Sequence, residues 1–168
     1  MKTTAATRFT RRQFLHRAAA AIAAPMIIPG SVLGLNGAVA PSNRIVFGGI
    51  GLGNRARATL PNFLSFKEVQ YLAVSDSRRD RLKNAKDTVD THYGNKDCLA
   101  FPDFRELLAR PDIDAVSIAT GNRWHSMASM FASRAGKDIY CEKPISLTIR
   151  EGRNLVETCR RLGTIYQA

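Results

Sequence analysis

The sequence predicts an α/β fold in which a doubly wound parallel sheet is covered by helices on both faces. Three observations carry this prediction: short apolar runs without a helical period, helical segments between them, and a glycine-rich turn after the first run. Strand and helix alternate from residue 44 to the end of the chain, and short turns join them. Because parallel strands need crossover connections, this alternation places helices on both faces of one sheet.

Length and composition are those of a globular chain with one domain. The chain has 168 residues, of which 45% are hydrophobic and 23% are charged. These proportions exclude a disordered chain and a collagen-like chain. Three cysteines are too few for a disulfide scaffold, and Cys98, Cys141 and Cys159 are too scattered for a metal site. We therefore expect no metal, and we interpret Cys141 and Cys159 as packing residues.

The positive charge is divided unevenly along the chain. Residues 1–40 contain five basic residues and no acidic one, and the first acidic residue is Glu68. Residues 41–168 contain 20 basic and 14 acidic residues, which is a net charge of +6. This balance attracts a phosphate-bearing ligand, but it is weak evidence for nucleic-acid binding because no basic run follows residue 40. We expect no nucleic-acid partner.

The first forty residues have the pattern of an export signal. Residues 10–15 (TRRQFL) precede an alanine-rich apolar stretch, and a basic segment followed by a short apolar one is typical of a secretory signal. The paired arginines resemble the twin-arginine (Tat) signal, although His16 stands where lysine is usual. A basic tail is the alternative. We expect residues 1–40 to be signal and spacer, with the Tat machinery as partner and a periplasmic location or one at the outer face of the inner membrane.

The cleavage site of this signal stays open. Residues 38–40 (Ala-Val-Ala) fit the small-x-small rule, but Pro41 would follow the cut and obstruct the protease. Retention of the segment as an N-terminal anchor is therefore the alternative to cleavage.

Six segments are predicted to be strands. They are residues 44–50, 69–74, 98–101, 113–119, 138–142 and 164–168. The first is short, rich in β-branched residues and without helical period, which is typical of a strand buried on both faces. The third is short enough to be an edge strand, and the chain ends within the sixth.

The segments between these strands are predicted to be helices. The first covers residues 54–60 and is ended or kinked by Pro61. The second begins with a capping box of Ser77 and Asp80 and ends at Gly94. Its apolar residues step by three and four, as the buried face of a helix requires. They are Leu82, Ala85, Val89 and Tyr93.

Three further helices follow. A brief one is capped by Asp103 with Glu106 and ends before Pro111. Another runs from about residue 124 to 135 and stops at Gly136. The last begins with a capping box of Thr148 and Glu151 and stops at Gly163. Its predicted buried residues are Leu155, Val156, Cys159 and Leu162.

The turn after the first strand reads Gly51-x-Gly53-x-x-Ala56. Gly51 lets the chain turn sharply, Gly53 lets the main chain approach a pyrophosphate, and Ala56 permits close helix–strand packing. The next helix begins at Asn54. Its first residues, Asn54 and Arg55, then present free N–H groups to the phosphates. Glycines also serve ordinary tight turns, but this position between a strand and a helix favours a dinucleotide site.

Asp76 ends the second strand and lies 20 residues after Ala56, where the dinucleotide fingerprint expects an acidic residue. A carboxylate there accepts hydrogen bonds from the ribose hydroxyls and repels a 2′-phosphate, which favours NAD. Helix capping is the alternative role of Asp76. Arg78 and Arg79 stand close by and could accommodate the phosphate of NADP, so NADP is kept as the second cofactor.

Two further segments carry a family resemblance. They are residues 119–125 (ATGNRWH) and residues 135–144 (AGKDIYCEKP). With the glycine-rich turn, they resemble the Gfo/Idh/MocA oxidoreductases, named for glucose–fructose oxidoreductase and inositol dehydrogenase, whose hallmark is Glu-Lys-Pro after the fifth strand. The resemblance covers about residues 44–168. It implies a Rossmann dinucleotide-binding domain, NAD or NADP as cofactor, and a sugar or polyol as substrate.

The resemblance also implies roles for single residues. Lys143 would be catalytic, because it would face both the nicotinamide and the substrate hydroxyl and relay a proton. Glu142 would orient the site, and Pro144 would fix the direction of the lysine, through a cis bond if one forms. A solvated lysine beside a turn proline is the alternative reading of this pair.

The segment before the fourth helix is the less regular part of the resemblance. Its loop, which contains Thr120, would lie beside the cofactor, and His125 would be a second catalytic residue. However, Gly121 and Asn122 stand where the family usually has a proline. A structural role for His125 is therefore the alternative.

Family members carry a second domain that covers the nicotinamide and holds the substrate, and this chain stops where that domain would begin. We expect either a fragment or a truncated product. The first hypothesis is the N-terminal part of an exported sugar or polyol oxidoreductase, homo-oligomeric at full length. The second is a stand-alone dinucleotide-binding module without turnover. A third, a Rossmann domain for another ligand such as S-adenosylmethionine, is disfavoured by Asp76 and by Lys143-Pro144.

Overall fold

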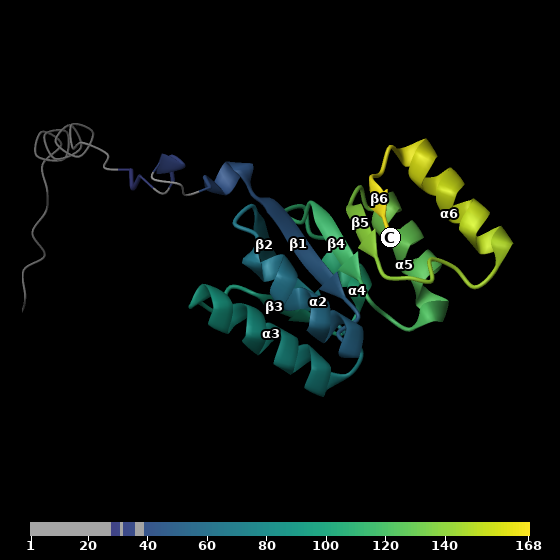
Figure 1. Ribbon diagram of the computed structural model, residues 1–168, viewed down its shortest axis with the longest axis horizontal. Coiled ribbons are helices and arrows are strands. Elements are labelled where there is room, and N and C mark those ends of the chain that lie inside the picture. Colours follow the sequence, from purple (N-terminus) through teal and green to yellow (C-terminus); the bar gives the residue numbers. More distant parts are fainter. Residues whose placement is uncertain (1–27, 31, 36–38) are drawn as a thin grey trace, which may run out of the picture.

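The structure, a computed structural model, describes residues 28–30, 32–35 and 39–168 (Figure 1). The twin-arginine motif at residues 10–15 lies outside these ranges, so the export signal stays a prediction. A short 3-10 helix at Pro41–Asn43 precedes the alternation of strands and helices. Within the described ranges, no helix is long and apolar enough to cross a membrane.

Six strands form one sheet in the order β3-β2-β1-β4-β5-β6, and every neighbouring pair is parallel. They are β1 (Ile45–Ile50), β2 (Val69–Ser75), β3 (Leu99–Phe101), β4 (Ala115–Ile118), β5 (Asp138–Cys141) and β6 (Tyr166–Gln167). The predicted strands and the doubly wound fold are confirmed. The strand order reverses between β1 and β4, and ligands of such sheets bind outside the carboxyl ends at this point.

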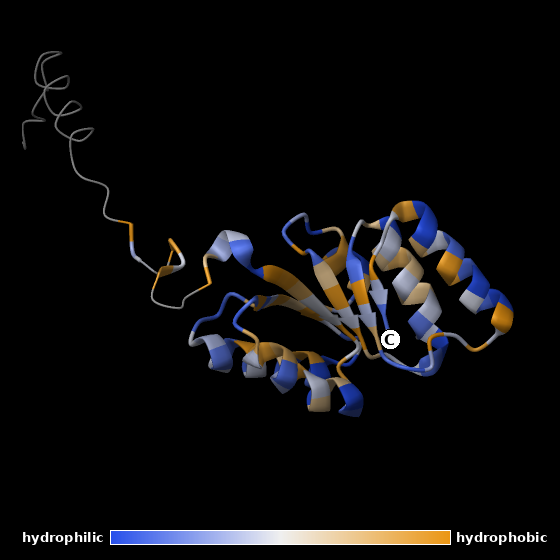
Figure 2. Cartoon of the chain, turned by 45° about the horizontal axis from the view of Figure 1, so that its top comes forward, coloured by the Kyte–Doolittle hydropathy of each residue, from blue (hydrophilic) through white to orange (hydrophobic). Residues whose placement is uncertain are grey.

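Helices cover both faces of the sheet. They are α2 (Asn54–Ser65), α3 (Arg79–Tyr93), α4 (Phe104–Leu108), α5 (His125–Arg134) and α6 (Ile149–Leu162), with a 3-10 turn η3 (Asn122–Trp124) before α5. Side chains from α2 and α3 join one buried cluster, and those from α4, α5 and α6 join another. Hydrophobic residues are concentrated in the strands and on the sheet-facing sides of the helices, whereas the outer helix surfaces are mostly hydrophilic (Figure 2). Helix α6 is an exception, with Ile149, Val156 and Leu162 exposed.

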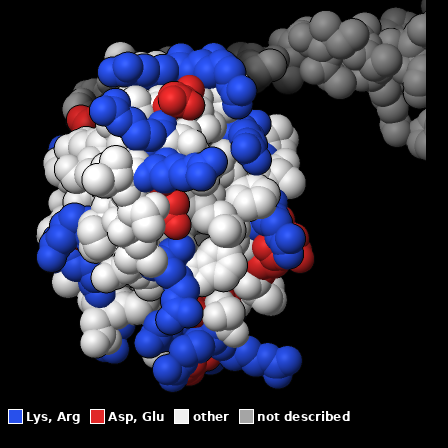
Figure 3. Space-filling model, turned by 90° about the vertical axis from the view of Figure 1, so that its right-hand side faces the viewer, with Lys and Arg blue, Asp and Glu red and all other residues white. Residues whose placement is uncertain are grey.

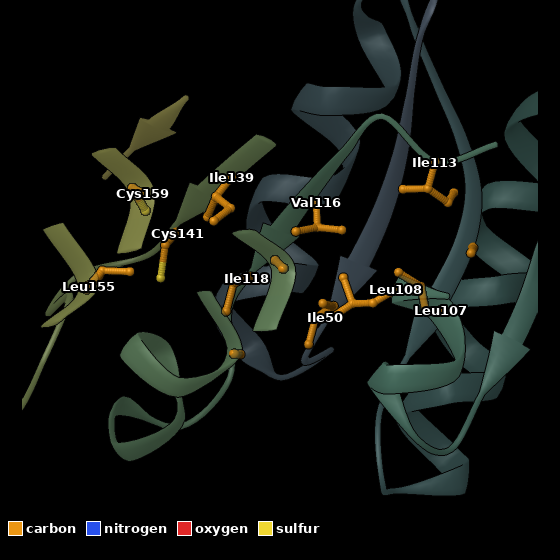
Figure 4. Close-up of a cluster of buried hydrophobic side chains, with 13 residues drawn as sticks. Ile50, Leu107, Leu108, Ile113, Val116, Ile118, Ile139, Cys141, Leu155 and Cys159 are labelled. Carbon is orange, nitrogen blue, oxygen red and sulfur yellow. The ribbon is translucent and has the colours of Figure 1, made fainter. Parts of the chain in front are cut away.

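The two clusters follow the alternation of side chains along each strand. Ala73 belongs to the cluster beneath α4, α5 and α6, which Figure 4 shows, whereas the next residue, Val74, belongs to the cluster beneath α2 and α3. Ser117 of β4 lies on this second face, with its hydroxyl 2.6 Å from that of Tyr71. Burial raises the pKa of Tyr71, so the contact is a hydrogen bond between neutral groups.

The sequence left open whether Pro61 ends or kinks its helix; α2 continues through Pro61, so the expected bound at residue 60 is wrong. A proline inside a helix removes one backbone hydrogen bond and costs about 3 kcal/mol. Beyond it, Leu64 is buried, and the ring of Phe63 lies 5.3 Å from that of Phe47. Burial of these two side chains offsets the lost hydrogen bond.

The predicted capping box at α3 is also wrong. Arg78 is the N-cap residue and no side chain caps the helix, because Asp80 pairs with the Arg78 guanidinium at 2.8 Å instead. By contrast, Asp103 and Thr148 cap α4 and α6 through side-chain oxygens, as predicted. Gly94 ends α3 in the left-handed conformation, also as predicted.

Helix α6 buries fewer residues than its periodicity predicts. Leu155 and Cys159 are buried, but Val156 is 38% exposed and Leu162 is 46% exposed. The sheet beneath α6 ends in the two-residue strand β6, so it covers only a narrow stripe of the helix.

Candidate cofactor and active site

Gly51 makes the sharp turn out of β1 that the sequence predicts. Its φ is +81°, and a Cβ at this position would lie 2.6 Å from the backbone nitrogen of Thr120. Its N–H donates to the Ser75 carbonyl at 2.8 Å. The turn therefore requires glycine, because both the backbone conformation and the neighbouring Thr120, in the loop after β4, exclude a side chain.

Gly53 leaves the N-terminus of α2 open. It is the N-cap residue, with no side-chain hydrogen bond to the helix, and the first helical bond runs from Arg57 to the Gly53 carbonyl. A Cβ on Gly53 would meet only the end of the Arg81 side chain, at 3.3 Å. The N–H groups of the first turn are thus free for an anion, as the pyrophosphate of a dinucleotide requires.

Asp76 connects the glycine-rich turn to the turn before α3 through two hydrogen bonds. Its Oδ2 accepts the Leu52 N–H at 2.7 Å, and its Oδ1 accepts the Arg78 N–H at 2.8 Å. The second contact reaches the N-cap residue of α3, but it is not a helix cap, because no side chain bonds to the first helical N–H groups of α3. Each carboxylate oxygen keeps a second acceptor position, which a ribose hydroxyl can use.

A cavity of about 780 Å³ opens beside these residues, at the carboxyl ends of the strands. Gly51, Gly53 and Asp76 line one side of it. The other side is an apolar wall, which we define as Phe104, Trp124, Met127 and Phe131. Three of these side chains are unusually exposed for their size: Trp124 at 46%, Met127 at 44% and Phe131 at 38%. A flat aromatic ligand would cover this wall.

The Lys143 loop, which we define as residues 142–148, follows β5. The Glu142 N–H donates to the Ile118 carbonyl at 2.9 Å and extends the β4–β5 pairing by one residue. Lys143 is exposed, and its peptide bond to Pro144 is cis. The cis bond that the resemblance raised is therefore confirmed.

Glu142 itself is only 6% exposed, and its carboxylate pairs with an arginine of the glycine-rich turn. Its Oε1 lies 2.7 Å from Arg55 Nε. The contact is close enough for an ion pair, but its geometry gives Oε1 no hydrogen bond. Arg55 therefore supplies the charge that this buried carboxylate needs.

His125 is buried at the start of α5, with 2% of its surface exposed. Its Nδ1 lies 2.7 Å from the Pro144 carbonyl oxygen, and its Nε2 lies 3.1 Å from the Thr120 carbonyl oxygen. These contacts belong to the structural role that the sequence left as the alternative. The catalytic role of His125 stays a prediction.

The predicted site residues fall into two groups. Gly51, Gly53, Asn54, Arg55, Asp76 and Thr120 all line the cavity. Among its described lining residues there is none from the Lys143 loop, and His125 does not line it either. Two contacts connect the groups: Arg55 pairs with Glu142, and Thr120 is bound to His125.

The sequence missed the apolar wall and Arg81, which also lines the cavity. A signal for the wall was present in α5. Met127 and Phe131 are four residues apart and flank the buried stripe of Ala128 and Ala132, so they extend the apolar surface of this helix beyond the part that the sheet covers.

Basic side chains also gather away from the cavity, on the α5 and α6 side of the molecule (Figure 3). Helix α6 contributes four exposed arginines: Arg150, Arg153, Arg160 and Arg161. None of them lines the cavity, so part of the net charge lies away from the cofactor cavity.

Comparison with known proteins agrees with this geometry. Residues 45–168 match the Gfo/Idh/MocA family, described as an oxidoreductase family with an NAD-binding Rossmann fold. The myo-inositol 2-dehydrogenase of Thermotoga maritima is 29% identical over 118 residues, which are 70% of this chain and 34% of that protein. A glycosyl hydrolase family 109 protein of Saccharopolyspora erythraea is 34% identical over 116 residues, which are 67% of this chain and 25% of that protein.

Solved structures of other proteins are similar to this fold. A 3-ketoreductase from Actinomadura kijaniata, crystallised in complex with NADP, superposes with a TM-score of 0.62 and 28% identity over 74% of this chain and 38% of that one. The chain thus spans about a third of the length of such relatives. The family match includes the glycine-rich turn, Asp76 and Glu142-Lys143-Pro144. The chain therefore belongs to the Gfo/Idh/MocA oxidoreductases and contains their NAD(P)-binding Rossmann domain.

Proposed function

We propose that the chain is the nucleotide-binding part of an exported oxidoreductase that acts on a sugar or polyol and uses NAD in preference to NADP. The cavity is the observation that carries the cofactor part of this proposal. It joins the open N-terminus of α2, Asp76 and the apolar wall, which suit the pyrophosphate, a ribose and the adenine ring, respectively. The nicotinamide would then lie on the Thr120 side, toward the Lys143 loop.

With a dinucleotide bound in this way, each part of the site would have a physical role. The first N–H groups of α2 bind the pyrophosphate, and the apolar wall excludes water from the adenine. A bound nicotinamide supplies hydride transfer to or from a carbon of the substrate. The Lys143 ammonium is exposed and reaches solvent on this side, so it would hold or release the proton of the substrate hydroxyl.

The preference for NAD rests on Asp76 and on the position of Arg78. The Arg78 guanidinium is bound to Asp80 at 2.8 Å, while the Asp76 carboxylate lines the cavity. Arg81 and Arg105 also line it and could receive a 2′-phosphate. We expect Asp76→Ala to reduce the ratio of NAD affinity to NADP affinity, and calorimetric titration with both cofactors measures that ratio.

Binding of NADH to the chain is the direct test of the cofactor site. Gly53→Val places a branched side chain where the pyrophosphate approaches, and we expect it to weaken NADH binding at least tenfold, or about 1.4 kcal/mol. Gly94→Ala is the matched control, because it strains a remote glycine with a positive φ (65°) and should leave NADH affinity unchanged. Fluorescence titration with NADH decides between them, and equal affinities in the wild type and Gly53→Val would refute the site.

The substrate part of the proposal is supported by the relatives. One is a myo-inositol 2-dehydrogenase, and this chain spans about a third of its length. We expect cofactor binding but little turnover from residues 1–168, because fixing two reactants in geometry contributes about 7–11 kcal/mol to lowering a barrier. Joining a second half from a polyol dehydrogenase should give an NAD-dependent rate, which Lys143→Ala lowers about 10²–10⁴-fold. A Lys143-dependent rate from the chain alone would contradict this expectation.

The alternative, a binding module without turnover, predicts a different result in the same assay. NADH would bind as above, yet no joined second half would restore oxidation. The relative named as a glycosyl hydrolase suggests a further control, in which release of a sugar is measured beside the change in NADH absorbance.

Export is the part of the proposal that rests on the sequence alone. Arg11 and Arg12 lie in the twin-arginine pattern, before an apolar stretch. Replacement of both by lysine keeps the charge and should retain the protein inside the cell. Cell fractionation of the wild type and the double variant tests this, and normal export of the variant would refute the signal.

A further inference from the structure

His125 joins two loops that come from different strands. One loop follows β4 and carries Thr120, which lines the cofactor cavity. The other is the Lys143 loop, after β5. The ring of His125 lies between them, with Nδ1 at 2.7 Å from the Pro144 carbonyl oxygen and Nε2 at 3.1 Å from the Thr120 carbonyl oxygen.

These two contacts occupy both nitrogens of the ring. Both partners are backbone acceptors, so each ring nitrogen that carries a proton donates it to one of them. The side chain is also closed to solvent, at 2% exposure. An acid or base must come within hydrogen-bond reach of the proton that it transfers, and neither nitrogen of His125 faces the cavity.

Lys143 is in the opposite situation. Its side chain is exposed and makes no hydrogen bond or ion pair among the described residues. Its backbone is fixed on both sides, because the Glu142 N–H donates to the Ile118 carbonyl at 2.9 Å and the Pro144 carbonyl contacts His125. The placement of this flexible ammonium therefore depends on the loop that carries it.

We infer that His125 is a positioning residue that acts through the backbone of Pro144. Through this contact it anchors the Lys143 loop to the buried start of α5, beside Thr120, and thereby holds Lys143 at a set distance from the nicotinamide end of a dinucleotide bound in the cavity. The inference rests on the proposed function for its ligand. It gives His125 a task other than acid or base chemistry, and it explains why this histidine is buried between two carbonyl groups.

Three substitutions separate the two contacts. The amide nitrogen of asparagine lies where Nδ1 of histidine lies, and the amide nitrogen of glutamine lies where Nε2 lies, and in both side chains this nitrogen is a donor. His125→Asn therefore keeps a donor for Pro144, His125→Gln keeps one for Thr120, and His125→Leu keeps neither. Val89→Ala is the matched control for stability, because Val89 is buried in the cluster beneath α2 and α3 and contacts neither loop.

Amide hydrogen exchange without cofactor tests the bridge itself. The Leu147 amide of this loop donates to Glu151 Oε2 at 3.0 Å. Loss of one hydrogen bond of 0.5–1.5 kcal/mol should speed its exchange about 2–12-fold in His125→Leu and His125→Gln, relative to the rest of the chain. His125→Asn and Val89→Ala should keep the wild-type ratio. Equal ratios in all variants would overturn the bridge.

Chemical modification of Lys143 tests the positioning. A brief pulse of acetic anhydride, followed by peptide mass analysis, gives the acetylation rate of Lys143 with and without saturating NADH. We expect NADH to protect Lys143 in the wild type, His125→Asn and Val89→Ala, but much less in His125→Leu and His125→Gln, although these variants still bind NADH.

The outcomes separate the two proposals. If NADH protects Lys143 equally in all variants, the positioning role is wrong even though the cofactor site is right. If NADH does not bind the wild type, the proposed function and the positioning of Lys143 both fail, while hydrogen exchange still decides whether the bridge exists. Should His125→Leu not fold, the Asn and Gln variants make the same comparison.

Discussion

The glycine-rich turn after β1 and the Lys143 loop after β5 lie at the same edge of the sheet, but they are built differently. The turn is shaped by its own backbone: Gly51 has a φ of +81°, and Gly53 leaves the N-terminus of α2 uncapped. The Lys143 loop is held by distant side chains, Arg55 at Glu142 and His125 at Pro144. The proposed phosphate site is thus encoded within a few consecutive residues, whereas the position of Lys143 depends on three parts of the chain.

This difference predicts that substitutions in the turn act on folding and binding together, whereas those around Lys143 act on its placement. The largest expected effect is that of Gly51→Ala. A left-handed backbone costs a non-glycine residue about 1–2 kcal/mol, and overpacking against the Thr120 backbone adds about 1–3 kcal/mol. We expect the free energy of unfolding to fall by about 2–5 kcal/mol, measured by urea denaturation.

Gly53→Ala sharpens this prediction within the same turn. Its added Cβ meets only the flexible end of Arg81, at 3.3 Å, so it should cost far less stability than Gly51→Ala and reduce mainly NADH binding. Equal loss of stability in the two variants would show that the turn is not governed by the conformation of Gly51.

Asp76→Ala is expected to have the next largest effect on stability. It leaves the N–H groups of Leu52 and Arg78 without their acceptor, and an unsatisfied group costs about 1–3 kcal/mol where water cannot replace the partner. Because Asp76 is half-buried, we expect the lower part of that range in urea denaturation. Asp76→Asn keeps one acceptor oxygen and should lose less; a larger loss in Asn than in Ala would contradict the role of these bonds.

The smallest effect concerns a carboxylate far from both loops. A side-chain hydrogen bond from Lys86 lowers the pKa of Asp90 below its ordinary value. Because the folded-state pKa is the lower one, its stabilising contribution is present above the unfolded-state pKa and is lost as pH falls through the folded-state pKa. Unfolding curves of the wild type and Asp90→Asn should therefore converge as the solution is acidified. A constant difference from pH 7 down to acid pH would contradict this linkage.

The same contrast explains what the sequence could predict. Gly51, Gly53 and Asp76 follow a local spacing rule, and strands and helices follow local periodicity, so the fold and the position of these three residues beside one cavity were predictable. The contacts of His125 were not, because they depend on where two loops meet in space. The helix through Pro61 also depends on tertiary contacts, since the burial of Leu64 and Phe63 decides it. Trp124 and Phe131 were not predicted as site residues, because their exposure at the cavity depends on how far the sheet covers α5.

The proposed function requires a dinucleotide to bind in the cavity with its adenine on the apolar wall. Trp124 is the one tryptophan in the chain and belongs to that wall, so its emission reports directly on this position. We predict that NADH, NAD and ADP change Trp124 emission saturably, whereas nicotinamide mononucleotide does not, and that Gly53→Val weakens the response to NADH. Unchanged Trp124 emission in a wild-type chain that binds NADH would place the adenine elsewhere and contradict the account.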